Sequence, residues 1–135
     1  MKEVLILKEP LNKVSNAGDL FNKVKKVKID YEQENFILIC LNSCNQVIKS
    51  KVLFKGGLGE CAIYQNVLFR EALLNNSNSL IIAHNHPTGN LNPSECDKKV
   101  FDKLKEAGKI LKISVLDSII FNKKEFYSLN NEVEK

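Results

Sequence analysis

The stretch Leu80-Ile81-Ile82-Ala83-His84-Asn85-His86-Pro87 places both histidines of this 135-residue chain at the end of an apolar run. Such a run predicts a buried strand. In an extended backbone the side chains of residues i and i+2 point to the same side, and a residue before proline is held away from helical geometry. We therefore predict that the imidazoles of His84 and His86 face one point in space.

A helix is predicted after this strand. Asn92 is the expected N-cap, Pro93 the first helical residue and Glu95 the residue that closes a capping box, and Gly108 is the expected end. The apolar residues of this helix fall on one stripe: Val100, Phe101, Leu104 and Ala107. Asp97 lies on the same, inward-facing side.

The inward carboxylate of Asp97 requires a positive partner, because an isolated buried charge costs many kcal/mol. A metal ion would be such a partner. Two histidine nitrogens and one carboxylate oxygen suit a catalytic zinc whose fourth position is left for water, whereas structural zinc sites are usually closed by four protein ligands. Each part also has a simpler interpretation, namely ordinary strand-end histidines and an aspartate that serves only the helix dipole. Ser94, three residues before Asp97 on the same helical face, favours the combined metal interpretation.

These residues resemble a known family. The string from His84 to Asp97 has the form H-x-H-x(7)-S-x(2)-D, which is the JAMM metalloprotease motif of JAB/MPN domains. The fuller string also resembles the bacterial RadC branch, H-N-H-P-S-G-x-x-x-P-S-x-x-D, from which only Thr88 departs. The resemblance implies a mixed α/β fold related to the cytidine deaminases and a zinc ion held by His84, His86 and Asp97.

The resemblance extends to about residues 10 to 130. Further matching segments are Gln33-Glu34-Asn35-Phe36, Asn45-Gln46-Val47-Ile48, Arg70-Glu71-Ala72-Leu73, Leu116-Asp117-Ser118-Ile119-Ile120 and Ser128-Leu129. Two departures stand out. The family commonly has Asp-His where this chain has Asp117-Ser118, and we expect the chain to lack the helix-hairpin-helix segment that precedes the domain in full-length RadC proteins.

The resemblance also assigns roles outside the ligand set. Glu34, at the head of the buried run 36–41, would be the base that takes a proton from water and later passes it to the leaving group. Ser94 would donate a hydrogen bond to the developing oxyanion. The alternatives are that Glu34 is a solvated residue at the start of a strand, or that its neighbour Glu32 is the base.

Length and composition indicate one domain, 1–135, with a hydrophobic content of 44% that suffices for a single core. No segment approaches the ~20 consecutive apolar residues of a membrane span, and the N-terminus is too short and charged for a secretory signal. We therefore expect a cytoplasmic protein with no membrane association. The net charge of +4 is weak support for nucleic-acid binding, and the basic cluster at 23–28 is interpreted as a solvated helix face.

The four cysteines are predicted to be buried or free thiols: Cys40, Cys44, Cys61 and Cys96. Their spacing contains no C-x-x-C pair and therefore argues against a cysteine zinc site or a disulfide framework. A cytidine-deaminase site is also excluded, because that chemistry requires H-x-E followed by P-C-x-x-C.

The order of elements predicts a mixed central sheet flanked by helices. We expect helices at 16–26 and 62–75, the second with Val67, Leu68, Ala72 and Leu73 on or near its buried side. Five strands are expected. The first begins near residue 33, the second ends at about residue 54, and the others cover 80–86, 110–121 and 125–129.

The leading hypothesis is a JAMM-type zinc metallopeptidase or isopeptidase that cleaves an amide bond of a peptide or protein substrate. The alternative is a non-catalytic metal-containing module associated with DNA repair that binds DNA or a protein partner. The presence of both Glu34 and Ser94 favours the enzyme. Manganese, iron or nickel would also bind such ligands, and the sequence does not identify the substrate or the oligomeric state.

Overall fold

The computed structural model describes residues 14–56 and 64–130. Within these ranges three helices and five strands follow one another along the chain: α2 (Ala17–Val24), β1 (Asn35–Leu41), β2 (Val47–Lys55), α3 (Gln65–Leu74), β3 (Ser79–Asn85), α4 (Glu95–Leu111), β4 (Ser114–Phe121) and β5 (Phe126–Ser128). None of these helices is long and apolar enough to cross a membrane.

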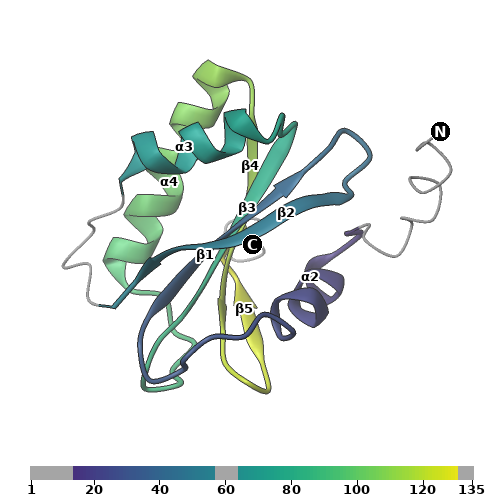
Figure 1. The fold of residues 1–135 in the computed structure, drawn as a ribbon. Helices are drawn as coiled ribbons and strands as arrows, with labels where there is room; N and C mark the ends of the chain where they lie inside the picture. The colour runs from purple at the N-terminus through teal and green to yellow at the C-terminus, as the bar shows by residue number, and fades with distance from the viewer. Residues whose placement is uncertain (1–13, 57–63, 131–135) are drawn as a thin grey trace, which may run out of the picture.

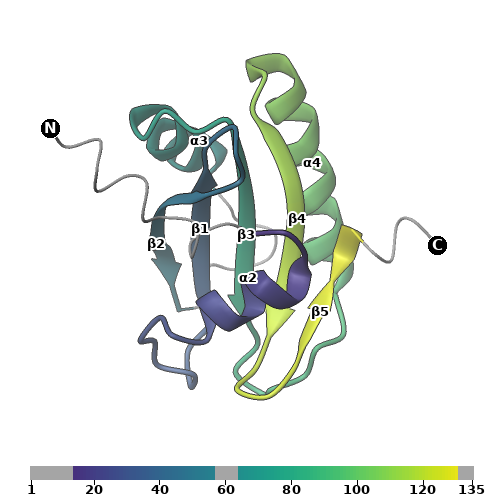
Figure 2. The same cartoon turned by 90° about the vertical axis from the view of Figure 1, so that its right-hand side faces the viewer.

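The strands form one mixed sheet in the order β2-β1-β3-β4-β5. The β3 and β4 strands are parallel, and every other neighbouring pair is antiparallel. Figures 1 and 2 show α3 and α4 on one face of this sheet and α2 on the other. The predicted fold class, a mixed sheet flanked by helices, is confirmed.

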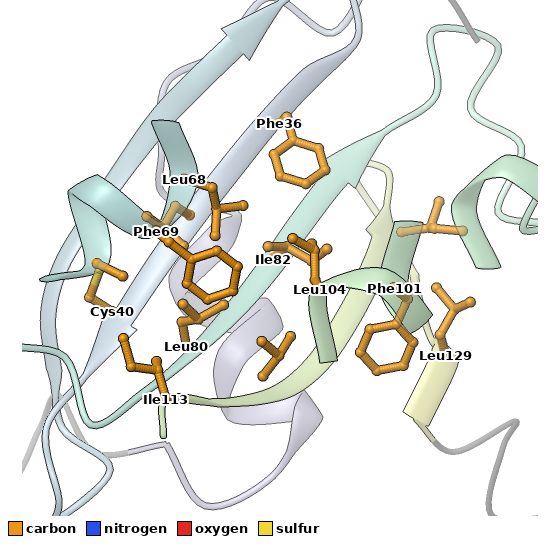
Figure 3. Packing of buried hydrophobic residues seen from close by; sticks show 14 residues of the cluster. Phe36, Cys40, Leu68, Phe69, Leu80, Ile82, Phe101, Leu104, Ile113 and Leu129 are labelled. Carbon is orange, nitrogen blue, oxygen red and sulfur yellow. The ribbon is translucent and has the colours of Figure 1, made fainter. Parts of the chain in front are cut away.

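The two central strands, β1 and β3, are buried along their whole length. Alternate side chains of β1 enter two separate clusters, because successive residues of a strand point to opposite faces. Phe36 and Leu38 pack beneath α3 and α4, whereas Ile37 and Ile39 pack against α2. Figure 3 shows the first cluster, to which α3 contributes Leu68 and Phe69 and α4 contributes Phe101 and Leu104.

The α3 helix departs from the predicted burial. Leu68 and Ala72 are buried as expected, but Leu73 is 54% exposed and Phe69 is buried instead. The buried positions follow the i, i+1, i+4 spacing of a helix stripe, and Leu73 lies one position beyond it. The predicted start at residue 62 is wrong: Tyr64 is extended and serves as the N-cap, so the helix begins at Gln65.

The N-terminal end of α4 also differs from the prediction. Ser94, rather than Asn92, is the N-cap, and Asp97 rather than Glu95 is the N3 residue of the capping box. The pairs Asn92–Glu95 and Ser94–Asp97 both have the three-residue spacing of a capping box. Only Ser94 and Asp97 bond each other's backbone N–H groups, which satisfies two donors. Pro93 therefore precedes the helix.

The C-terminal end of α4 lies beyond Gly108, at Leu111, and Lys112 follows in the left-handed conformation with φ 61°. Gly108 has a different role. A Cβ atom at this position would collide with the carbonyl oxygen of Ile113, whose N–H donates to the Gly108 carbonyl at 2.9 Å. The strand predicted from residue 110 consequently begins only at Ser114.

The remaining boundaries lie close to those predicted. Asn16 is the N-cap of α2, where its side chain accepts the N–H of Asp19, and the helix ends two residues before Lys26. The strand predicted through residue 54 ends at Lys55. The last strand, predicted at 125–129, is β5 and is one residue shorter at each end.

The cysteines divide into two groups. Cys40 is buried and Cys44 is exposed, and both are free as predicted. Cys96 is disulfide-bonded, so the prediction of a free thiol is wrong there, and Cys61 lies outside the described residues. Sequence spacing misses such a bond because pairing depends on the distance between Cα atoms in the folded chain.

Candidate metal centre

The two histidines and Asp97 converge at the carboxyl end of β3. His84 is the penultimate residue of that strand, His86 follows the strand directly, and Asp97 lies in the first turn of α4. The Nε2 atoms of His84 and His86 each lie 3.2 Å from a different oxygen of Asp97. One potential ligand atom from each residue lies within 4.8 Å of the others, so the three can hold a metal ion.

His84 gives the clearest sign that this group suits a cation. Its imidazole is 3% exposed, and neither ring nitrogen has a satisfied hydrogen bond, although Nε2 lies 3.2 Å from Oδ1 of Asp97. The ring is held nearly parallel to Phe36 at 6.1 Å between centroids. Buried polar atoms without partners are rare and costly. A metal ion at Nε2 would satisfy the nitrogen that faces Asp97.

His86 is oriented by its other ring nitrogen. Nδ1 lies 2.8 Å from the carbonyl oxygen of Asn90, a contact that assigns the proton to Nδ1. The lone pair of the neutral ring is then on Nε2, which faces Asp97. Metal-binding histidines are commonly fixed by this kind of second hydrogen bond.

The electrostatics of the group favour a positive charge. The Asp97 carboxylate raises the pKa of His86 above its ordinary value of 6.5, burial opposes this shift, and the Asn90 carbonyl and the Glu34 charge add to it. Burial raises the pKa of Asp97, but the two imidazoles and the Ser94 N–H outweigh burial and hold that pKa well below its ordinary range. The carboxylate is therefore ionised at neutral pH, as a metal ligand must be.

Ser94 fixes the carboxylate of Asp97. Its backbone N–H donates to Asp97 Oδ2 at 2.9 Å, and its hydroxyl oxygen accepts the Asp97 N–H at 3.0 Å. The cap thus holds the Asp97 carboxylate toward the histidines. The hydroxyl serves here as an acceptor, so its own proton is left for another bond. Ser94 is exposed, which gives that proton access to a substrate.

Glu34 lies beside the ligand group, immediately before β1. The antiparallel register pairs Phe36 with His84, and its continuation by two residues places Glu34 opposite His86 on the same face. The negative charge of Glu34 contributes to the raised pKa of His86. Glu34 is half-buried, and its carbonyl accepts the Gly56 N–H at 2.8 Å. Glu32, the alternative, is exposed.

Asn85, which the sequence analysis did not single out, connects β3 to the segment that carries Glu34. Its Oδ1 accepts the N–H of Asn35 at 2.8 Å and the Nδ2 of Asn35 at 3.2 Å. Its Nδ2 donates to the carbonyls of Gln33 at 2.9 Å and of Tyr31 at 3.3 Å. The backbone on both sides of Glu34 is therefore tied to the residue between the two histidines. The sequence offered one signal for Asn85, a polar residue between the two histidines at the end of an apolar run. The structure shows that this residue is fully buried on the opposite face of the strand.

Asp117 has a structural role in this fold. Its carboxylate accepts the Ser128 hydroxyl at 2.6 Å and the backbone N–H groups of Ser118 and Asn130. These bonds tie β4 to the chain at and after β5. Ser118, which stands where the resemblance expects histidine, is buried in β4.

A model of one protein family, described as a RadC-like JAB domain, matches residues 14–134. The chain belongs to the RadC-like JAB domain family. Curated relatives of this domain carry the name UPF0758 protein. The sequence is 38% identical to that of Chlorobium chlorochromatii over 118 residues, which is 87% of this chain and 53% of the relative.

Two further relatives come from a bacterium and an archaeon. The UPF0758 protein of Staphylococcus haemolyticus is 38% identical over 89% of this chain and 53% of its own length. That of Methanosarcina barkeri is 36% identical over 93% of this chain and 55% of its own length. The chain thus spans about half the length of the curated relatives it matches. The five-stranded mixed sheet with its helices is consistent with the JAB/MPN fold.

Proposed function

We propose that this RadC-like JAB domain is a zinc-dependent hydrolase of the JAMM type that cleaves an amide bond of a peptide or protein. The observation that carries the proposal is the buried His84 imidazole, which has no hydrogen-bond partner and faces the same point as His86 and Asp97. These three residues would hold the ion. Their donor set of two nitrogens and one oxygen leaves room for a fourth ligand, as in catalytic zinc sites.

The side chains around the ligands have the chemistry that amide hydrolysis needs. Zinc supplies Lewis acidity, which makes water a nucleophile near neutral pH. Glu34 would accept the proton of that water, because it lies immediately before β1 and its charge acts on His86. The same carboxyl group would return the proton to the leaving amine nitrogen, as a general acid and base does.

Ser94 would complete the reaction site. Its hydroxyl proton is available for the carbonyl oxygen of the scissile amide, on which negative charge develops as water attacks. Ser94 also keeps Asp97 in place through the helix cap. One residue therefore has two separable roles, a bond from its backbone to a ligand and a bond from its hydroxyl proton to substrate.

The first test is metal content, measured by elemental analysis on the purified protein without added metal. About one zinc per chain is expected in the wild type, little in His86→Ala, and an unchanged amount in Glu34→Gln. The absence of bound metal in the wild type, even after zinc is offered, would contradict the proposed site.

The second test is hydrolysis of peptide and isopeptide substrates by the zinc-loaded protein. Glu34→Gln should abolish turnover, whereas Glu32→Gln is the matched control and should retain it, because Glu32 is exposed. A fully active Glu34→Gln variant would refute the role of Glu34. Metal that binds at one per chain without any turnover would favour a non-catalytic module.

A further inference from the structure

A cavity of about 320 Å³ lies beside His86, at the edge of the sheet where β3 and β4 end. Resting on the proposed function, we propose that this cavity is a substrate subsite that binds a carboxylate next to the scissile amide. Its volume lies at the lower end of the range of small-molecule sites and suits one side chain or a chain terminus. The lining residues come from three separate segments: Tyr31, the loop 86–89, and the turn 122–125 between β4 and β5.

The wall of the cavity is more apolar than polar. Tyr31 packs its ring edge-on against Phe121 at 6.0 Å between centroids, so the aromatic wall rests on the core. Pro87 and Thr88 also line the cavity. Such a wall suits the aliphatic stem of a glutamate or the last residue of a peptide, while the charged end requires a separate partner.

Two lysines supply that partner. Lys123 and Lys124 line the cavity from the turn, and Lys123 Nζ lies 5.4 Å from the centre of the Tyr31 ring. Neither lysine forms an ion pair with another described residue, and the third charge of the lining is a single carboxylate, Glu125. The cavity therefore has a net positive charge and favours an anionic group.

The lysine turn is held at a fixed place relative to the metal ligands. Asn122 Oδ1 accepts the N–H groups of Lys124 at 2.8 Å and Glu125 at 2.7 Å, which shapes the turn. Asn122 Nδ2 donates to the carbonyl of Gly89 at 3.0 Å, which joins the turn to the loop that begins at His86. A carboxylate bound by the lysines would therefore lie at a set distance from the ligand group.

The experiment measures binding by fluorescence anisotropy to the zinc-loaded Glu34→Gln protein, in which turnover is blocked. The probes are labelled peptides that differ only at one position, Glu, Gln or Lys, each with a free or an amidated C-terminus. We expect the acidic peptides to bind about tenfold more tightly than the neutral ones, equivalent to about 1.4 kcal/mol. A preference that depends on the Glu position assigns the subsite to an acidic side chain. One that depends on the free terminus assigns it to a peptide end.

Charge reversal provides the control. Replacing Lys123 and Lys124 together by Glu should turn the preference toward the Lys peptide, whereas Lys103→Glu, on the exposed side of α4, should leave it unchanged. Equal binding of acidic and neutral peptides, or no binding of any of them, would overturn the subsite. Wild-type hydrolysis without an acidic preference would overturn it while the proposed function stands. A preference that responds to charge reversal in a protein without turnover would support the subsite while the proposed function fails.

Discussion

Replacement of Asn85 by Ala tests whether the amide between the two histidines holds the Glu34 segment in place. Asn85 is fully buried and its side chain makes four hydrogen bonds. The lost bonds are not equivalent. The Asn35 N–H is buried and would be left without its partner, whereas Asn35 Nδ2 keeps the carbonyls of Asp30 and Gln33.

The expected cost follows from this difference. The Asn35 N–H, left unsatisfied, costs about 1–3 kcal/mol, and the bond to the Gln33 carbonyl at 2.9 Å adds about 1 kcal/mol, whereas the longer bonds at 3.2 and 3.3 Å add little. We therefore expect Asn85→Ala to lower the free energy of unfolding by about 2–4 kcal/mol. That is a large part of the 5–15 kcal/mol typical of a domain.

The assay is urea unfolding of the metal-free protein at neutral pH, with Asn42→Ala as the matched control. Asn42 makes three side-chain hydrogen bonds, to Cys44 and Gln46, in a turn that water can reach. Because water can replace these partners, its replacement should cost only about 1 kcal/mol in total. Equal losses in the two variants, or a loss below about 1 kcal/mol for Asn85→Ala, would refute the reasoning.

Four further predictions concern the candidate metal ligands and α4. Because the folded pKa of His86 is raised, protonated His86 stabilises the metal-free protein fully below pH 6.5, and this stabilisation is lost as pH rises through the folded value. His86→Gln should remove this pH dependence of the free energy of unfolding, measured in urea. The folded pKa of Asp97 is lowered, so its ionised carboxylate stabilises the fold above about pH 3.8, and this stabilisation is lost as pH falls through the folded value. Asp97→Asn should therefore reduce the fall in the free energy of unfolding at acid pH. Ser94→Ala should cost about 1 kcal/mol as a lost cap and weaken zinc binding about tenfold in a competition titration; unchanged affinity would show that Asp97 does not depend on the cap. Gly108→Ala should lower the melting temperature, through a loss of about 1–3 kcal/mol, because the added methyl meets the carbonyl of Ile113; an unchanged temperature would contradict that contact.

The sequence by itself predicted that His84, His86 and Asp97 converge, because the relations between these residues act over short stretches of chain. The i, i+2 spacing of His84 and His86 acts through the geometry of one strand, and the serine and aspartate spacing acts through one helical turn. The buried runs of β1 and β3 likewise indicated central strands, because a strand covered on both faces needs apolar residues throughout.

The competing helix starts show where local rules stop. Asn92 and Ser94 both satisfied the capping spacing, and only the reciprocal bonds between Ser94 and Asp97 decide between them. Gly108 likewise matched a helix end, but its actual constraint is the approach of Ile113 after the helix. Each choice depends on atoms that the spacing of residue types does not place.

Tertiary structure alone decided how the ligand group is supported and what lies beside it. The bonds of Asn85 join residues about fifty positions apart. The cavity combines Tyr31 with residues of the turn 122–125. Hydrogen-bond partners and cavity walls are set by which strands become neighbours in the sheet, and the antiparallel pairing of β1 with β3 sets Phe36, two residues after Glu34, opposite His84. The sequence thus identified the three residues that converge, whereas the strand order determined their surroundings.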